Sequence, residues 1–286
     1  VLVAVLWGLG ITFAKAGMDQ FPPILLTALR FTVTALALVW FVEIPRGLLR
    51  RIFLISIVVA TIQYSLTFTG MYGIDASAAA IVIQLEVPFA TLLAAIFLTD
   101  RIGWRRIAGM VLAFAGVVLI AYQPDLRGEL FSILLVAAGA FTWAVGQVMI
   151  KSLGGAVSGF GLIAWVAIFS TPQLFAVSFA LEDGHMAAIA AADWRGWAII
   201  LYLGLAMTAL GYGLWFRLIG LYPVSHVMPF LLLLPVVTMI GGVAMLGEAL
   251  TVWTLAGAAL VLTGVGIILR RQKSPVTAPA AVPRGD

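Results

Sequence analysis

Long apolar runs, each about 20 residues, make up most of this 286-residue chain and leave only short connectors between them. A helix of that length crosses the roughly 30 Å hydrocarbon core of a bilayer, whereas a strand of a membrane barrel needs only about 9–11 residues. Helices and closed barrels are the structures that satisfy every backbone hydrogen bond in lipid. The runs therefore predict an all-α membrane protein. We expect ten spans, at residues 1–17, 23–43, 52–73, 76–98, 104–122, 130–151, 158–181, 194–217, 222–246 and 251–269.

Composition excludes a water-soluble fold. Hydrophobic residues make up 63% of the chain and charged residues only 10%, while soluble domains carry about 25% charged residues. The chain has no cysteine, which excludes disulfides and cysteine-based metal sites. The two histidines, His185 and His226, have no spacing to Glu86 that is typical of a metal site. We expect neither a metal nor a cofactor.

Basic residues predict the orientation in the membrane. Twelve of the 16 lysines and arginines follow even-numbered spans, whereas the connectors after odd-numbered spans hold only Arg127 and Arg195. Lysine and arginine accumulate in cytoplasmic loops, so both termini should lie in the cytoplasm, as in a multi-pass protein of a bacterial inner membrane. The net charge of +4 then reflects topology, and we expect no nucleic-acid partner. Residues 274–286 lack apolar periodicity and are predicted to form a disordered cytoplasmic tail.

The chain also repeats itself. The motif at residues 7–15 recurs at 143–151, and later landmarks recur in the same order: Tyr64 and Phe68 as Tyr212 and Phe216, and Pro88 as Pro235. Each copy contains five spans, and an odd number brings the second copy into the membrane from the opposite side. Connector charge agrees, because residues 100–106 contain three arginines and the equivalent residues 247–251 contain none. We predict two inverted five-helix repeats, at residues 1–122 and 123–273.

A fixed order of landmarks marks both repeats. A serine-containing segment precedes a mid-span proline, an acidic residue and a Gly-x6-Gly span: Ser77, Pro88, Asp100 and Gly109/Gly116, then Ser225, Pro235, Glu248 and Gly257/Gly264. This order resembles the EamA family of the drug/metabolite transporter superfamily, and within it the YddG-type aromatic amino acid exporters. The resemblance implies ten helices in two inverted repeats and export of small metabolites, commonly amino acids. Asp100 departs from the glutamate usual in the family, although either acid can cap the following helix.

Charged residues inside apolar spans are the first candidates for function, because burying them is costly. Glu86 is the only acid deep in a span, and Arg30 lies about seven residues into the second span. Glu86 could carry a coupling proton or face a substrate ammonium. Alternatively, Glu86 and Arg30 form a structural ion pair, or Arg30 extends to the outer interface. Lys15 and Lys151, at the ends of spans, are expected to snorkel to the interface.

Amides and aromatic rings deep in the spans complete the candidate substrate site. Amides can bond the charged ends of a substrate, and rings can pack on its apolar part. On an unbroken helix Gln84 and Glu86 point about 200° apart, and we favour Gln84 as the residue that faces the cavity. Tryptophans near span ends are expected to anchor at the interface, whereas Trp7, Trp143 and Trp165 lie deeper and could either pack in the core or contact the substrate. His226 could be a hydrogen-bonding residue or a titrating gate. The predicted substrate-binding residues are Trp7, Gln63, Tyr64, Gln84, Glu86, Trp143, Gln147, Trp165, Tyr212 and His226.

Two prolines and two glycine-rich spans indicate how the repeats could move and meet. Pro88 and Pro235 occupy equivalent mid-span positions, where each removes a backbone hydrogen bond, so they could be hinges or static kinks. The Gly-x6-Gly faces allow two helices to approach closely, either within the chain or in a dimer. We expect a monomer, with a homodimer as the alternative.

These features predict a secondary carrier rather than an enzyme. A duplicated bundle suits alternating access, and the few deep charges favour a net-neutral, amphipathic substrate such as an apolar or aromatic amino acid. The alternative is efflux of cationic drugs, which Glu86 would attract among aromatic rings. An intramembrane enzyme would need a cluster of nucleophile and base, and a channel would not need two exchangeable half-bundles. The expected partners are a small-molecule substrate and membrane lipid.

Overall fold

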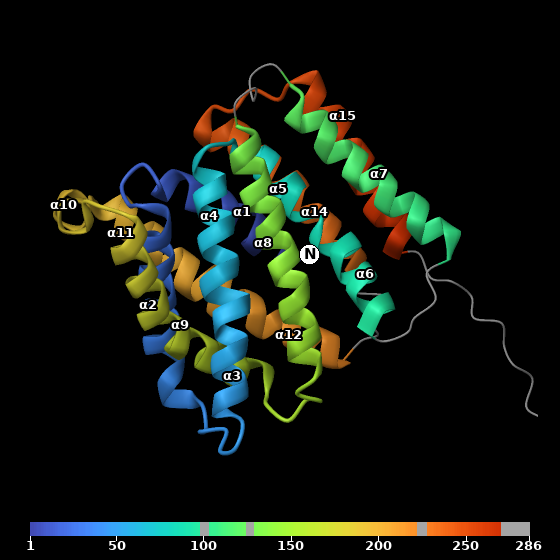
Figure 1. Cartoon of the computed structure of the whole chain (residues 1–286). Coiled ribbons are helices and arrows are strands. Elements are labelled where there is room, and N and C mark those ends of the chain that lie inside the picture. Colours follow the sequence, from blue (N-terminus) through green and yellow to red (C-terminus); the bar gives the residue numbers. More distant parts are fainter. Residues whose placement is uncertain (98–102, 124–128, 222–227, 270–286) are drawn as a thin grey trace, which may run out of the picture.

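The computed structural model describes residues 1–97, 103–123, 129–221 and 228–269, and every regular element in these ranges is a helix (Figure 1). Eight helices are long and apolar enough to cross a membrane: Pro23–Phe41, Leu49–Tyr72, Ala76–Phe97, Trp104–Ala121, Leu130–Lys151, Gly159–Leu181, Trp194–Trp215 and Val252–Leu269. Two further apolar helices, Leu2–Gly17 and Phe230–Leu246, are shorter. The all-α membrane class is therefore confirmed, while the count of ten crossings stays a prediction. Asp100, His226 and the tail at 274–286 lie outside the described residues.

Several spans are interrupted, so that one span comprises more than one regular helix. The first half contains α1 (Leu2–Gly17), α2 (Pro23–Leu38), α3 (Leu49–Ser56), α4 (Gln63–Tyr72), α5 (Ala76–Ile83), α6 (Glu86–Phe97) and α7 (Trp104–Ala121). The second half contains α8 (Leu130–Lys151), α9 (Gly159–Leu181), α10 (His185–Ala191), α11 (Trp194–Leu201), α12 (Gly211–Leu221), α14 (Leu233–Gly241) and α15 (Val252–Leu269).

Three spans in the described part of the chain contain a π-helical stretch: two of the stretches lie at equivalent positions, and the third is η6 (Gly242–Leu246), after α14. The stretch η2 (Ile57–Ile62) joins α3 to α4, and η4 (Tyr202–Leu210) joins α11 to α12. Each of these two stretches ends just before a repeated tyrosine, Tyr64 or Tyr212. A π turn holds an extra residue, which rotates the following side chains by about 100° relative to a regular helix, and such turns are frequent at functional sites. The stretches therefore decide which side chains of α4 and α12 face the centre of the bundle.

The two repeated prolines lie at helix starts rather than in helix interiors. α5 ends at Ile83 and α6 begins at Glu86, so Pro88 is the third residue of a new helix. Pro235 is likewise the third residue of α14, which follows the 3-10 segment η5 (Met228–Leu232). The N–H groups of the first residues of a helix have no acceptor within the helix. Proline, which lacks an N–H group, is therefore tolerated there. The expected mid-helix kinks are thus helix breaks, and the hinge role of the prolines stays a prediction.

The Gly-x6-Gly faces pack α7 against α15 within the chain (Figure 1). A Cβ atom on Gly109 would lie 2.6 Å from the Gly264 carbonyl oxygen, and one on Gly116 would lie 2.7 Å from the Gly257 carbonyl oxygen. Only glycine allows the backbones to approach this closely. Because the earlier glycine of α7 meets the later glycine of α15, the two helices run antiparallel. Of the two expected uses of these faces, the structure shows packing within the chain.

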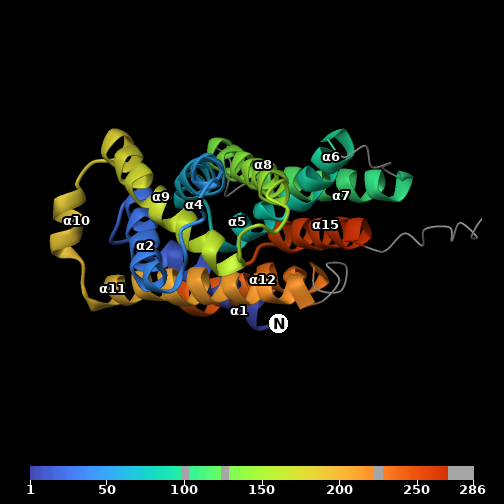
Figure 2. The ribbon, with the colours of Figure 1, turned by 90° about the horizontal axis from the view of Figure 1, so that it is seen from below.

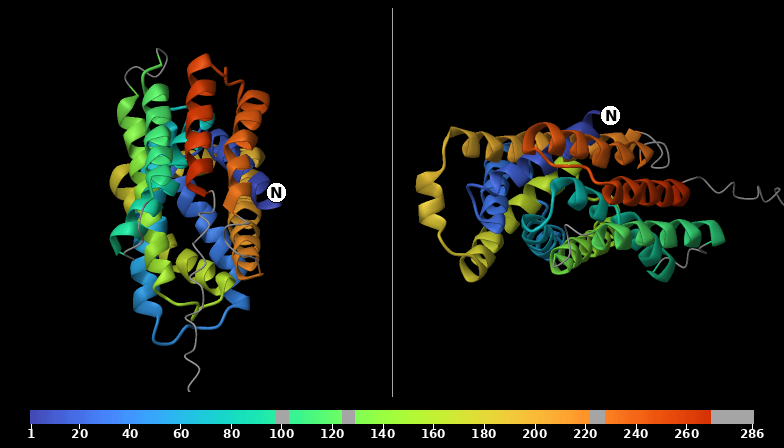
Figure 3. Two further views of the ribbon diagram at one scale, coloured as in Figure 1. Left: turned by 90° about the vertical axis from the view of Figure 1, so that its right-hand side faces the viewer. Right: turned by 90° about the horizontal axis from the view of Figure 1, so that it is seen from above.

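The helices form a broad, flattened bundle (Figures 2 and 3). The pair α7 and α15 lies at one edge, and α10 lies at the opposite edge. Between these edges α2 packs against α9 and α4 packs against α8. The central helices come from both halves of the chain, so a site at the centre is built by both.

Candidate functional site

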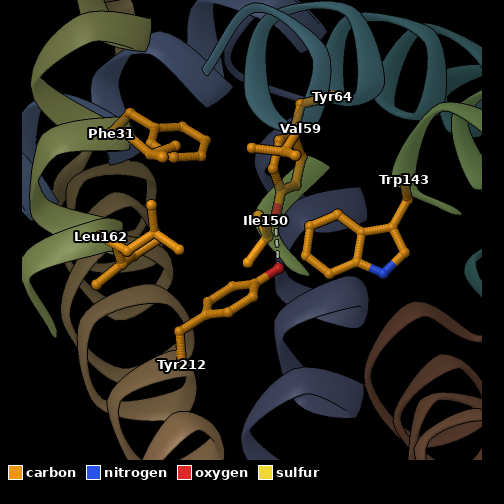
Figure 4. Close-up of a pocket in the computed structure, with 9 residues that line it drawn as sticks. Phe31, Val59, Tyr64, Trp143, Ile150, Leu162 and Tyr212 are labelled. Carbon is orange, nitrogen blue, oxygen red and sulfur yellow. Dashed lines mark hydrogen bonds between the residues drawn. The ribbon is translucent and has the colours of Figure 1, made fainter. Parts of the chain in front are cut away.

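A small apolar cavity lies among the central helices (Figure 4). Its walls come from α2, η2, α4, α8, α9 and α12, and therefore from both halves of the chain. Ligand pockets are typically lined in this way, mostly by apolar side chains with a few polar groups. The lining residues are Phe31, Val59, Tyr64, Trp143, Ile150, Leu162, Ile163, Val166 and Tyr212.

A hydrogen bond between two tyrosines crosses this region. The Tyr64 and Tyr212 hydroxyl oxygens are 3.1 Å apart, and Figure 4 shows the two side chains pointing toward each other. The residues occupy equivalent positions in the two halves, and both are buried, with 7% and 9% of their surface exposed. Apart from the Trp143 indole N–H, their hydroxyls are the only polar side-chain groups among the lining residues. A polar ligand in the cavity would therefore compete with the bond between Tyr64 and Tyr212.

Two repeat-equivalent tryptophans pack against Tyr212. Its ring centroid lies 4.8 Å from that of Trp7 and 6.0 Å from that of Trp143. Trp143 lines the cavity, whereas Trp7 supports Tyr212 from outside it and donates from Nε1 to the Met207 carbonyl oxygen at 3.1 Å. Aromatic pairs in such geometries stabilise each other by about 0.5–1.5 kcal/mol beyond area burial. Both tryptophans thus hold one partner of the tyrosine pair in place.

Arg30 lies against the other tyrosine and is completely buried, with 0% of its surface exposed. Its guanidinium carbon lies 4.4 Å from the ring centroid of Tyr64, 5.0 Å from that of Phe31 and 5.5 Å from that of Phe68. Contact with ring faces stabilises a desolvated cation by about 2 kcal/mol. The rings therefore offset part of the cost of burying this charge.

Among the residues that the structure describes, no carboxylate offsets the remaining cost. Arg30 Nη1 lies 3.7 Å from the Met207 sulfur, which is a weak acceptor, and within the described residues Nε and Nη2 have no hydrogen-bond partner. Glu86 forms no ion pair with it, and the side chain does not reach an interface. Both interpretations of Arg30 from the sequence, a structural pair and an extension to the outer interface, are therefore wrong.

Glu86 carries the second charge inside a span, and it is not among the residues that line the cavity. It is the first residue of α6, directly after the break in the fourth span, and it is half-buried. No donor in the part of the chain that the structure describes hydrogen-bonds its carboxylate. Of the two charges, Arg30 is the one in contact with the tyrosine pair, through the ring of Tyr64.

The sequence profile of the EamA-like transporter family matches residues 1–122 and again residues 130–270. The chain belongs to this family. It is 32% identical over 276 residues to the "Probable amino-acid metabolite efflux pump" of Salmonella typhimurium, covering 93% of this chain and 92% of that one. An Escherichia coli protein of the same name is 29% identical with the same coverage. The "Probable terminal-alkyne amino-acid exporter" of Streptantibioticus cattleyicolor is 29% identical over 95% of this chain and 92% of its own.

A solved crystal structure shares the fold of this EamA-like transporter. It aligns with a TM-score of 0.65 over 93% of each chain at 18% sequence identity, and at this identity the likeness concerns the fold alone. The resemblance seen in the two repeats is confirmed by the family match. The protein is a multi-pass membrane protein of a transporter family.

Three predicted amides of this EamA-like transporter do not line the cavity. Gln63 is buried and donates from Nε2 to the Thr67 hydroxyl at 3.1 Å. Gln84 is buried at the end of α5, and Gln147 is half-buried on α8. The preference for Gln84 over Glu86 assumed an unbroken helix. Because the helix breaks at residues 84–85, that angular argument does not apply.

Trp165 and His226 complete the predicted set. The Trp165 indole donates to the Glu43 carbonyl oxygen at 2.9 Å, in the connector that follows α2. Trp165 is absent from the cavity wall and packs against the hydrophobic core, with its ring centroid 5.7 Å from that of Phe169, in agreement with the alternative of core packing. His226 lies outside the described residues.

At one end of the bundle, Glu248 joins the two halves of the transporter. Its Oε1 accepts from the Ala76 N–H at 2.6 Å, and its Oε2 accepts from the Ser77 N–H at 3.1 Å and from the Ser77 hydroxyl. The carboxylate therefore caps the N-terminus of α5, where unpaired N–H groups and the helix dipole favour a negative charge. The resemblance implied a cap on the following helix, but Thr251 fills that role by accepting from the Thr254 N–H at 3.1 Å.

Lys15 caps a helix at the same end. Its Nζ donates to the carbonyl oxygens of Met71 and Tyr72, at 2.9 and 2.8 Å, which end α4. A lysine in this position satisfies carbonyls that lack helical partners and opposes the negative end of the helix dipole. The side chain is thus bonded to the end of a neighbouring helix, and its snorkelling to the membrane interface stays a prediction. Neither this cap nor that of Glu248 was identified from the sequence.

Proposed function

We propose that this chain is an exporter in the bacterial inner membrane that carries small neutral amino acids, including apolar and aromatic ones, by alternating access. The observation that carries the proposal is the apolar cavity between the two halves, with the buried guanidinium of Arg30 against Tyr64 in its wall. The printed names of the three relatives, two amino-acid metabolite efflux pumps and one amino-acid exporter, support the same substrate class.

The cavity suits an amino acid better than a sugar or a nucleotide. A sugar carries many hydroxyls, and each one buried without a partner is costly. The walls supply only three polar side-chain groups, on Tyr64, Trp143 and Tyr212. A neutral amino acid instead concentrates its polarity at one end, where one cation and one anion can bind it. Its apolar side chain can then pack on the aliphatic walls, such as Leu162 and Val166.

Alternating access requires two half-bundles that rock around the site. In support of two inverted five-helix repeats, residues 1–122 and 123–273, α7 runs antiparallel to α15, and the π stretches η2 and η4 and the helix-breaking prolines occupy equivalent positions.

The proposal also includes an orientation. If both termini are cytoplasmic, as the basic residues predict, the end that holds Lys15 and Glu248 is the outer one. The cavity would then open toward the cytoplasm, because Ile150 and Leu162 lie next to the connector between α8 and α9.

Counterflow in proteoliposomes tests this function. Vesicles loaded with unlabelled L-leucine should take up labelled L-leucine, because a carrier exchanges substrate through one reorienting site. A panel of twenty amino acids should show competition by neutral apolar and aromatic members and none by charged members. Leu162→Trp, which fills the cavity, should abolish exchange, whereas Leu134→Trp, at a position of α8 with 56% of its surface exposed, should retain it. Absence of exchange for every amino acid would refute the proposal.

The same vesicles test the role of Glu86 in energy coupling. If its carboxylate carries a coupling proton, an imposed pH gradient should drive accumulation in the wild type and not in Glu86→Gln. If the carrier only equilibrates its substrate, the gradient should change neither protein. Facilitated diffusion down a cytoplasmic gradient needs no titrating group.

Efflux of cationic drugs is the second candidate function, and Glu86 favours it. A carboxylate without a hydrogen-bond donor near aromatic rings attracts cations. Arg30 acts against this reading, because its fixed positive charge lies on Tyr64, which lines the cavity. Tetraphenylphosphonium in the same assay distinguishes the two. Exchange of this cation without exchange of any amino acid would replace the first proposal by the second.

A further inference from the structure

The hydrogen-bonding capacity of Arg30 is mostly unused. A guanidinium has five N–H donors and cannot lose its proton in a protein. In Arg30, Nη1 contacts the Met207 sulfur, while Nε and Nη2 are buried and have no partner among the described residues. A buried charge with unsatisfied donors is costly to the fold. A chain that keeps one in its centre needs a reason beyond packing.

The two unpartnered nitrogens form one edge of the guanidinium plane. Nε–H and one N–H of Nη2 point in the same direction, and this side-on edge binds both oxygens of a carboxylate through two parallel hydrogen bonds. The three rings around the guanidinium carbon offer no acceptor for these donors, apart from the hydroxyl of Tyr64, which is bonded to Tyr212. The chemistry left open at Arg30 is therefore that of a carboxylate.

Tyr64 connects this edge with the cavity. Its ring lies 4.4 Å from the guanidinium carbon, and the same residue lines the cavity, as does Phe31, the neighbour of Arg30. The bond to the Tyr212 hydroxyl holds the ring where it covers Arg30. A ligand that takes over this bond would release the ring, and α4 begins directly after the π stretch η2, where a helix can change register most easily.

We propose that Arg30 is the subsite for the carboxylate of the transported amino acid, with Tyr64 as its movable cover. This inference rests on the proposed function and adds to it the group that distinguishes an amino acid from an amine. Glu86 provides the opposite charge for the ammonium, and the side chain of the substrate packs in the cavity lined by α8 and α9. A purely structural Arg30, or one that pairs with Glu86 in another state of the cycle, would not select for a free carboxylate.

A competition experiment on the wild-type protein tests the selection without any substitution. Counterflow of labelled L-leucine is measured against increasing L-leucine, L-leucinamide and 3-methylbutylamine. The amide keeps the size, the shape and the ammonium of leucine and loses only the negative charge. We expect the amide and the amine to compete at least about tenfold more weakly, as the loss of one charged hydrogen-bonded pair implies. Equal competition by leucine and leucinamide would overturn the inference and leave the amino-acid carrier intact.

Two substitutions then assign the selection to Arg30. In Arg30→Gln, leucine and leucinamide should compete about equally. Arg30→Lys should keep only part of the preference for leucine, because lysine keeps the charge but lacks the side-on edge. Arg195→Gln, on the exposed start of α11, should keep the wild-type preference. A wild-type preference retained in Arg30→Gln would overturn the inference. A wild-type protein that exchanges no amino acid would instead overturn the proposed function.

Discussion

Two groups of charges in this protein have opposite surroundings. At one end of the bundle, both oxygens of Glu248 are bonded to the start of α5, and Lys15 is bonded to the end of α4. In the centre, Arg30 keeps two nitrogens without partners, and Glu86 accepts no hydrogen bond from any described residue. Unsatisfied charges are costly in apolar surroundings. The difference agrees with our proposal that a central charge binds the substrate, whereas we expect the end charges to stabilise the fold.

Glu248→Ala should give the largest loss of stability. It removes three hydrogen bonds to a carboxylate, and each bond to a charged group contributes about 1.5–3 kcal/mol, part of which water at the freed helix end restores. We expect the free energy of unfolding to fall by about 3 kcal/mol. Thermal unfolding in detergent, followed by tryptophan fluorescence, measures this change.

Two controls accompany that variant. Glu248→Gln keeps the shape and one acceptor oxygen, so its loss should be about half as large. Glu43→Ala removes a carboxylate from an exposed residue and should unfold like the wild type. If Glu248→Ala and Glu43→Ala unfolded at the same temperature, the end charges would not stabilise the fold and the contrast with the centre would disappear.

Lys15→Met should have a smaller effect of the same sign. It frees the carbonyl oxygens of Met71 and Tyr72 at the end of α4, and we expect a loss of about 2 kcal/mol. The repeat itself supplies the matched control, because the equivalent Lys151 is exposed. Lys151→Met should change the free energy of unfolding by less than about 0.5 kcal/mol. Equal losses in the two variants would show that the position in the repeat, and not the helix cap, decides the effect.

Arg30→Met tests whether the central charge differs from the end charges in its contribution to stability. Replacing an unsatisfied buried charge by an apolar side chain of similar length removes both the desolvation cost and the contacts with the rings. We expect the free energy of unfolding to change by less than about 1 kcal/mol in either direction, while counterflow of leucine is lost. Measuring both properties on one preparation is essential. A loss of stability as large as that of Glu248→Ala would mean that Arg30 is a structural residue.

The smallest expected change in stability comes from Asp193, whose carboxylate is hydrogen-bonded but exposed to water. Its Oδ1 accepts hydrogen bonds from the side chain of Gln20 at 2.8 Å and from the N–H groups of Arg195 and Gly196 at the start of α11. The bond from Gln20, followed by that from Gly196, lowers the pKa of this carboxyl group. A lowered folded-state pKa contributes stability above the unfolded-state value, near 3.9, and this contribution is lost as the pH falls through the folded-state pKa.

The expected result is a small difference in unfolding temperature between the wild type and Asp193→Ala that is present at about pH 7 and shrinks below about pH 4. Gln20→Ala should reduce the difference, because it removes the main cause of the lowered pKa. A difference that stays constant down to about pH 3 would show that the ionised carboxylate contributes nothing at this position.

The eight helices that are long enough to span a membrane were predicted to within about three residues at each end, and the site much less well. The predicted span at 130–151 coincides with Leu130–Lys151, because bilayer thickness acts on each helix separately and composition alone reports it. Tyr64, Trp143 and Tyr212 lie at the cavity, and their contact with substrate stays a prediction. The apolar walls, formed by residues such as Leu162, were not identified, because an apolar side chain looks the same in sequence whether it faces lipid, core or cavity.

Two of the predicted glutamines were wrongly expected to face the cavity. Gln63 and Gln84 were selected as polar residues deep in a span, and both lie away from the cavity wall. Their positions depend on the π stretch η2 and on the break after α5, which change the direction of the side chains that follow. A periodicity argument assumes a regular helix, and it fails where the backbone departs from one.

The sequence by itself determined that this is an all-α membrane protein with a duplicated chain, and it determined the transporter family. These properties follow from hydropathy, run length and repeated motifs, each of which is local. Only the tertiary structure decided which charges are satisfied. Glu248 meets Ser77 across 171 positions of the chain, and Tyr64 meets Tyr212 across 148. Hydrogen bonding requires atoms to approach within about 3 Å, and no local pattern specifies which distant groups do so.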